Sequence, residues 1–270
     1  MILVVGATGL VGSEVCQRLM RRGEPVRALV RATSSKEKVE VLRSSGVELC
    51  LGDLKDPQSI VAACRGVDAV VSTASSTLAR QPGDSIQSVD EAGQLNLVNA
   101  AKDANVGRFL FVSFRRTPGI SFPLGDAKAQ VETAITSLNF TVIQASWFME
   151  VWLSPALGFD HANAAARIYG PGTSPISWVS FRDVAEICAV ALRHPAASRK
   201  TIEFGGPEAL TPFKSWLASR KSAAGRSGWN MSLNRCCSRN LREQRIRCRK
   251  VRCVDARISA RRRNEHGTGS

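Results

Sequence analysis

Three glycines near the start of the chain have a spacing suited to holding a phosphate group. Gly6, Gly9 and Gly12 follow a β-branched run typical of a buried strand and precede a helical pattern. In such a unit the first glycine permits a tight turn, the second lets a pyrophosphate approach the backbone, and the third lets the helix pack on the strand. The N–H groups at the helix start then face the phosphates. The pattern predicts a dinucleotide site rather than an ordinary tight turn. Thr8, Leu10 and Val11 are expected to belong to the same site.

A basic side chain stands where the adenosine ribose of such a dinucleotide is expected. Arg31 ends the second expected strand, about 20 residues beyond the turn, where NAD sites usually carry a carboxylate. A carboxylate there repels a 2′-phosphate, whereas a guanidinium pairs with it through two hydrogen bonds. Arg31, with Lys36 or Lys38 nearby, therefore predicts NADP in preference to NAD as the cofactor. The alternative is that Arg31 is a solvated surface charge.

Strand and helix patterns alternate along the chain, which predicts an α/β protein with a Rossmann-type doubly wound parallel sheet. Ligands of such sheets bind at the carboxyl ends of the strands. The expected strands cover residues 2–5, 26–30, 47–51, 69–73, 109–113, 141–145 and 201–204, and the expected helices cover 11–22, 36–44, 58–63, 89–104 and 126–138.

The composition divides the chain into three parts. We expect a nucleotide-binding core over residues 1–145, a small irregular substrate-side lobe with the last strand over 146–212, and a basic tail over 213–270. Residues 214–270 hold 16 of the 37 Lys and Arg but 3 of the 23 Asp and Glu, so most of the net charge of +14 lies there. The tail has few apolar residues and predicts disorder or a segment translated out of frame. The rival interpretation is an arm that binds nucleic acid non-specifically.

The remaining composition narrows the class of protein. No apolar run approaches the ~20 residues that cross a bilayer, and the first strand leaves no room for a leader before it. The eight cysteines lack the paired spacing of a zinc site, so we predict no metal. These features predict a soluble, cytoplasmic protein without a membrane partner.

Further motifs accompany the glycine turn, at residues 26–31, 52–56, 67–73, 108–113, 147–149 and 181–185. Together with the sequence Gly-Ala-Thr-Gly-Leu-Val-Gly at 6–12, they resemble the NmrA-like family of atypical, extended-type short-chain dehydrogenase/reductases. The resemblance covers residues 1 to about 212.

The resemblance implies further cofactor contacts. Asp53 and Leu54 are expected beside the adenine, with the carboxylate accepting a hydrogen bond from the amino group. Ser72, Thr73 and Ala74 are expected where the chain passes the ribose and phosphates. Alternatively, Asp53 makes a local Asx-turn and the small residues serve packing alone.

The resemblance also implies a catalytic set of Ser, Tyr and Lys, in which the Lys follows the Tyr by four residues on one helix. Ser113 and Lys128 occupy the places of the Ser and the Lys, and Lys128 is also expected to hold the cofactor's ribose. Leu124 stands where the Tyr is expected, and the single tyrosine of the chain is Tyr169. Otherwise, Lys128 is a solvent-facing lysine paired with Glu132.

Two functions follow from this pattern. The first is an oxidoreductase that transfers hydride between NADP(H) and an unidentified small substrate. The second is a regulator that senses NADP without turnover, as a redox sensor or an assembly factor, and acts through a protein partner.

Overall fold

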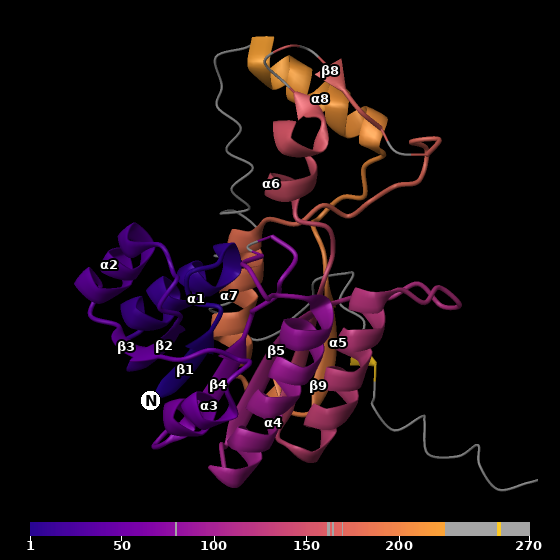
Figure 1. Ribbon diagram of the computed structural model, residues 1–270. Coiled ribbons are helices and arrows are strands. Elements are labelled where there is room, and N and C mark those ends of the chain that lie inside the picture. Colours follow the sequence, from indigo (N-terminus) through magenta and orange to yellow (C-terminus); the bar gives the residue numbers. More distant parts are fainter. Residues whose placement is uncertain (79, 161–162, 164, 169, 225–252, 255–270) are drawn as a thin grey trace, which may run out of the picture.

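The computed structural model describes residues 1–78, 80–160, 163, 165–168, 170–224 and 253–254, with no account of the side chains of 219–224 and 253–254. Its main sheet has seven parallel strands in the order β9-β6-β5-β4-β1-β2-β3, and the two-residue β10 pairs antiparallel with β9 (Figure 1). The strands are β1 (Ile2–Val5), β2 (Val26–Val30), β3 (Glu48–Leu51), β4 (Ala69–Ser72), β5 (Arg108–Phe114), β6 (Phe140–Ala145), β9 (Lys200–Phe204) and β10 (Cys253–Val254).

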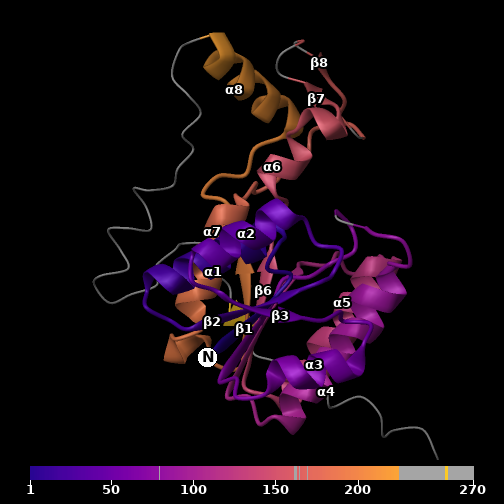
Figure 2. The ribbon, with the colours of Figure 1, turned by 60° about the vertical axis from the view of Figure 1, so that its left-hand side comes forward.

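Helices cover both faces of this sheet (Figures 1 and 2). One face carries α1, α2 and α7, and the other carries α3, α4 and α5. The predicted doubly wound Rossmann-type fold is therefore confirmed. The helices are α1 (Leu10–Arg21), α2 (Lys36–Ser44), α3 (Pro57–Cys64), α4 (Gln94–Asp103), α5 (Pro123–Ala134) and α7 (Phe181–Ala191).

The central strand β1 is buried on both faces of the sheet, which gives it a continuous apolar sequence. All four of its residues are buried, with Ile2 and Val4 in the core beneath α1 and Leu3 and Val5 in the core beneath α3 and α4. A parallel strand that is covered on both faces is continuously apolar rather than alternating. The burial of β1 fixes the position at which the chain leaves the sheet for the glycine turn.

The helical segments differ from the predicted ones in several places, and α7 has no counterpart among the predicted helices. A π-helix, η1 (Ile86–Gly93), precedes α4 where one helix over 89–104 is predicted. Its start is fixed by a capping box between Ser85 and Ser88. Helix α5 begins at Pro123 and ends in a 3₁₀ turn, η2 (Ile135–Ser137). Proline is favoured at a first helical position, where its missing N–H would have no partner.

A small lobe lies beyond the carboxyl ends of the strands (Figures 1 and 2). An aromatic contact joins its parts, since the rings of Phe159 and Trp216 meet edge to face with centroids 5.5 Å apart. The chain is helical to Ala224, beyond the start of the predicted tail at 213, whereas residues 225–252 and 255–270 of that tail lie outside the described residues. The lobe comprises α6 (Met149–Trp152), η3 (Pro155–Leu157), β7 (Phe159–Asp160), β8 (Ala165–Ala166) and α8 (Pro212–Ala224), and η4 (Pro195–Ala197) precedes β9.

A helix that crosses a bilayer must be both long and apolar. Within the described ranges, the structure contains no helix with the length and apolar character needed to cross a bilayer.

The glycine turn is packed too closely at Gly6 and Gly12 to admit a side chain. A Cβ at Gly12 would lie 2.2 Å from the carbonyl oxygen of Gly6 and 2.8 Å from Oγ1 of Thr73. Gly6 itself has a φ of +84°, which favours glycine. The third glycine therefore sets how closely α1 approaches the end of β1.

We expect Gly12→Ala to destabilise the fold by about 1–3 kcal/mol, because the added methyl group overlaps backbone atoms that cannot move independently. Urea unfolding of the full chain measures this change. Ser13→Ala, one residue further along α1, serves as the control and is expected to change stability by less than about 0.5 kcal/mol. Equal stability of the Gly12→Ala variant and the unmodified protein would contradict the role given to this contact.

Candidate functional site

The glycine turn is less crowded at Gly9 than at Gly6 and Gly12. A Cβ at Gly9 would meet only the carbonyl oxygen of Gly6, at 3.1 Å. Gly9 is also the N-cap of α1, and no described side chain caps this helix. The N–H groups at the first positions of α1, including those of Leu10 and Val11, are therefore free for an anion. This geometry is a cradle that a bound pyrophosphate can fill.

A groove runs beside this turn, between α1 and α2. It has a volume of about 270 Å³, and Thr8, Gly9 and Leu10 form its wall on the side of the turn. Lys38 of α2 lies on the opposite wall and donates a hydrogen bond from Nζ to the carbonyl oxygen of Thr8, at 3.2 Å. The predicted basic neighbour of Arg31 is thereby tied to the glycine turn itself.

Arg31 has an ionic partner that the sequence does not reveal. Its Nη1 lies 2.7 Å from Oδ2 of Asp84, while Nζ of Lys55 lies 2.6 Å from Oδ1 of the same carboxylate. The side chain of Asp84 is only 1% exposed, and the backbone N–H of Gln81 also donates to it. Burial alone would raise the pKa of Asp84, but the hydrogen bonds from Lys55 and Arg31 outweigh it and lower the pKa to about 2. The guanidinium group of Arg31 is thus fixed by its ion pair with Asp84 and is not freely solvated.

The structure places the two residues predicted beside the adenine in different environments. Oδ1 of Asp53 accepts a hydrogen bond of 2.9 Å from the backbone N–H of Lys55, which is the Asx-turn given as the alternative. Its Oδ2 lies 3.8 Å from Nζ of Lys55. Leu54 is buried in the core, where a Cβ on Gly93 would meet its side chain at 2.8 Å. Any cofactor contact of Leu54 would therefore come from its backbone.

The predicted residues at the end of β4 support the turn from within the sheet. Ser72 is fully buried and donates a hydrogen bond of 2.7 Å to Oε1 of Gln94, whose Nε2 donates to the carbonyl oxygen of Ala74. Thr73 donates from Oγ1 to the carbonyl oxygen of Val5, at 3.1 Å. These bonds fix the β4 loop beside the glycine turn, so a cofactor would contact this loop mainly through its backbone.

Lys128 is buried, and the alternative of a solvent-facing lysine paired with Glu132 is wrong. Its Nζ donates to the carbonyl oxygen of Val112 at 3.2 Å and lies 4.7 Å from the centre of the Phe111 ring. Burial lowers the pKa of Lys128 below its usual 10.5, and the charges of Asp90 and Glu132 partly oppose that effect. A buried amine with a lowered pKa is the form of lysine suited to proton transfer.

Ser113 makes a connection that the sequence does not predict. Its hydroxyl donates to Oε1 of Glu132, and Nε2 of Gln144 donates to Oε2 of the same carboxylate at 3.1 Å. The hydroxyl proton of Ser113 is therefore committed to Glu132, and its lone pairs are what it can offer a ligand. The three residues come from β5, α5 and β6, so no local spacing signals this cluster.

The place of the expected tyrosine remains apolar in the structure. Leu124 lies one turn before Lys128 on α5. Tyr169 lies outside the described residues. Near the lobe, the partly exposed rings of Trp147 and Trp152 meet edge to face, with centroids 4.4 Å apart. None of these described side chains replaces the phenol as a proton donor.

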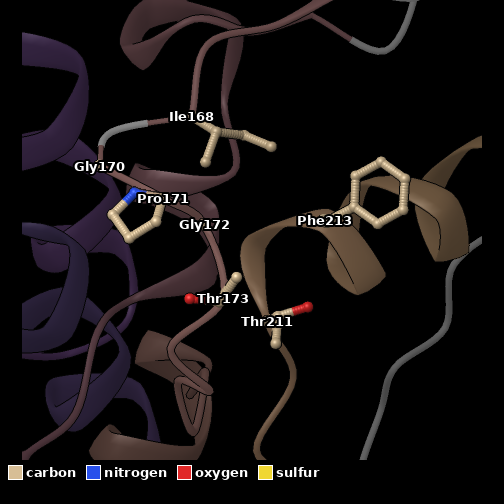
Figure 3. A pocket seen from close by; sticks show the side chains of 7 residues that line it. All are labelled: Ile168, Gly170, Pro171, Gly172, Thr173, Thr211 and Phe213. Carbon is tan, nitrogen blue, oxygen red and sulfur yellow. The ribbon is translucent and has the colours of Figure 1, made fainter.

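A second cavity, of about 500 Å³, lies within the small lobe and contains none of the predicted site residues (Figure 3). Its walls come from the loop before α7 and from the start of α8, and its lining residues are Ile168, Gly170, Pro171, Gly172, Thr173, Thr211 and Phe213. Figure 3 shows hydroxyl groups on Thr173 and Thr211 and the ring of Phe213, so the cavity is largely apolar with a few polar groups.

Residues 1–213, which include the glycine turn, Arg31 and Lys128, match the family model of the NmrA-like family. The chain belongs to the NmrA-like family. The match confirms both the predicted family and the predicted extent of the resemblance.

Relatives of this NmrA-like protein fall into two kinds. An NAD(P)H azoreductase from Xenophilus azovorans is 32% identical over 84% of this chain and 74% of its own length. A photosystem II assembly factor from Trieres chinensis is 30% identical over 81% of this chain. The present chain spans only 66% of the length of that assembly factor. The family thus includes reductases and assembly factors at comparable similarity.

A solved structure supports the fold. The NADPH complex of a quinone oxidoreductase from Escherichia coli superposes with a TM-score of 0.69 and 22% identity, over 83% of this chain and 76% of the other. At this identity the likeness concerns the fold of the NmrA-like protein.

We expect Asp84→Asn to destabilise the protein by about 1–3 kcal/mol, because Arg31 and Lys55 lose their shared counter-charge while remaining partly exposed. The pKa of Asp84 is lowered on folding, so its stabilising effect is complete above the usual value of 3.8 and disappears as the pH falls towards 2. Denaturant unfolding of both proteins between neutral and acidic pH measures this. Glu40→Gln, at an exposed pair with Arg43, is the control and should have little effect at any pH. A stability difference between Asp84→Asn and the unmodified protein that does not vary with pH would contradict the assignment.

Proposed function

We propose that this protein binds NADP(H) and transfers hydride between it and a small, largely apolar substrate. The observation that carries the proposal is the start of α1 at Gly9, which no described side chain caps. Gly6 and Gly12 are required by close packing on several atoms, whereas a Cβ at Gly9 would meet a single atom, the carbonyl oxygen of Gly6 at 3.1 Å. A backbone cradle of this kind at a helix start binds phosphate groups.

The residues around the cradle fit the two ends of the cofactor. Arg31 and Lys38 supply positive charge for a 2′-phosphate on the adenosine side. Ser113 and Lys128 lie at the carboxyl end of β5 and on α5, where the resemblance places the nicotinamide. A bound NADPH supplies the hydride. Lys128 holds the ribose through its ammonium group or donates a proton to the reduced substrate, and Ser113 orients that substrate through its lone pairs.

A second function is favoured by a specific observation. Leu124 occupies the place of the tyrosine acid, and the hydroxyl proton of Ser113 is already donated to Glu132. An NADP-sensing regulator or assembly factor needs cofactor binding but no proton donor. The similarity to photosystem II assembly factors agrees with this alternative, in which a protein partner takes the place of the small substrate.

We expect the full-length protein to bind NADPH more tightly than NADH, because Arg31 pairs with a 2′-phosphate. Arg31→Gln should lower the NADPH affinity by about tenfold or more, the effect of one charge-assisted hydrogen bond, and leave the NADH affinity nearly unchanged. Isothermal titration calorimetry with both cofactors measures the two affinities. Arg43→Gln is the matched control, since Arg43 is an exposed arginine on α2 that pairs with Glu40. Equal affinities of the unmodified protein for NADPH and NADH would show that Arg31 does not read the cofactor.

For an active reductase, Lys128→Ala should reduce turnover of a panel of quinones, enones and aldehydes by at least about tenfold. NADPH affinity should fall only modestly, because the pyrophosphate contacts remain. NADPH oxidation, followed by absorbance, measures the turnover, and Lys102→Ala, at an exposed lysine of α4, is the control.

The same assay separates the two functions. If the unmodified protein oxidises no NADPH with any panel member but becomes protected from protease on binding NADPH, the regulatory function is the correct one. Turnover that survives Lys128→Ala would remove Lys128 from the mechanism while leaving cofactor binding in place.

A further inference from the structure

Asp90 is a buried carboxylate with an unused oxygen. It is 1% exposed and lies on the π-helix η1, an uncommon backbone form that is frequent at functional sites. Its Oδ2 accepts hydrogen bonds from the backbone N–H of Ser76 at 3.0 Å and from Oγ of Ser76 at 2.6 Å. Its Oδ1 is buried and has no hydrogen-bond partner among the described residues. A buried acceptor of this kind requires an explanation, because native proteins rarely leave one unpaired.

A buried cation lies on the neighbouring helix. Helix α5, which carries Lys128, packs against η1. Lys128 forms no direct ion pair with any described carboxylate, and Nζ contacts the carbonyl oxygen of Val112 and the ring of Phe111. An ammonium that leaves water without a counter-charge is strongly disfavoured. A carboxylate that acts on Lys128 through the protein interior would offset this cost.

Two carboxylates act on Lys128 in this way, Asp90 from η1 and Glu132 from α5 itself. Strand β5, the third element packed against the lysine, contributes the apolar Phe111 and a backbone carbonyl group. Glu132 is partly exposed and shares its charge among hydrogen bonds from Ser113 and Gln144. Asp90 is fully enclosed, so its charge is less screened by solvent. Both carboxylates raise the pKa of Lys128, and the effect of Asp90 is the larger.

We propose that Asp90 is the positioning residue of the site: its unpaired charge keeps Lys128 in the ammonium form inside the protein. The inference deepens the proposed function, on which it rests for its chemical meaning, since an ammonium can hold a ribose or donate a proton whereas a neutral amine cannot donate one readily. The hydrogen bonds to Ser76 give Asp90 a second effect. They tie the loop after β4, which adjoins the glycine turn, to the same carboxylate.

The titration of Lys128 in the cofactor-free protein tests this proposal. Protein labelled with ¹³C-lysine gives one ε-carbon signal that Lys128→Met removes, and the midpoint of that signal against pH reports the protonation of Lys128. We expect Asp90→Asn to lower the midpoint by about one to two pH units, because a nearby opposite charge is lost. Glu132→Gln should lower it by less. A midpoint that stays unchanged in Asp90→Asn would overturn the proposal.

Two control variants separate charge from structure. Asp126→Asn removes an exposed carboxylate of α5, two residues from Lys128, that bonds to Ser121, and should leave the midpoint unchanged. Ser76→Ala removes a hydrogen bond to Asp90 without removing its charge and should also leave the midpoint near its original value. A midpoint lowered as far by Ser76→Ala as by Asp90→Asn would overturn the proposal, because a structural role alone would then explain the effect.

A folding failure is also informative. If Asp90→Asn does not fold, the double variant Asp90→Asn with Lys128→Met removes both buried charges and should restore the folded state, as measured by circular dichroism. A double variant that also fails to fold would overturn the proposal. NADPH and NADH titrations of the unmodified protein test the proposed function independently of the lysine titration. Absence of binding there would refute the proposed function, while the lysine titration would still decide the pairing.

Discussion

The approach of α1 to the end of β1 is the constraint on which the arrangement of the site depends. A side chain on Gly12 would overlap the carbonyl group of Gly6 and the hydroxyl group of Thr73, so the helix, the turn and the end of β4 meet without any intervening atoms. This contact aims the free N–H groups of α1 at one place and brings the β4 loop beside it. The proposed binding surface is therefore largely backbone, whose position is set by the sheet and not by side-chain rotamers. Side chains add selectivity at the two ends of this surface.

At the proposed adenosine end, the charges of the ion pairs around Arg31 are balanced rather than strongly positive. Arg31 and Lys55 are matched by the carboxylates of Asp84 and Asp53. Selection of a 2′-phosphate by net positive potential would require an excess of cations here. Because these charges balance, selectivity for a 2′-phosphate in the proposed function depends on the geometry of the Arg31 guanidinium group, which Asp84 holds in place and which retains N–H donors beyond the one given to that carboxylate. A residue outside the recognised motifs thus determines how the motif residue can act.

The sequence predicts the parts of the structure that depend on local pattern. The strands, the glycine turn and the span of α2 follow from apolar runs, from glycine and proline positions and from helix caps. Each of these signals lies within a few residues of the element that it predicts. It does not predict the partners of Arg31 and Ser113, because Asp84 and Glu132 lie far from them in the chain and reach them only through the fold. The burial of Lys128 is missed for the same reason. Its spacing from Glu132 is typical of an exposed ion pair, whereas packing of η1 and β5 against α5 encloses it.

The enclosed ammonium group bears on both proposed functions. Lys128 has three N–H donors, and one is given to the carbonyl oxygen of Val112. The others have no hydrogen-bond partner among the described residues, so in the proposed function a ligand oxygen that accepts from one of them gains a charge-assisted bond. A reductase uses such a bond to orient the cofactor and then to deliver a proton, for which a lowered pKa is an advantage near neutral pH. A sensor uses the same bond only to make the bound state more stable than the free one. Both proposed functions use Lys128 as an ammonium group, and they differ in whether a group that accepts the proton ever reaches it.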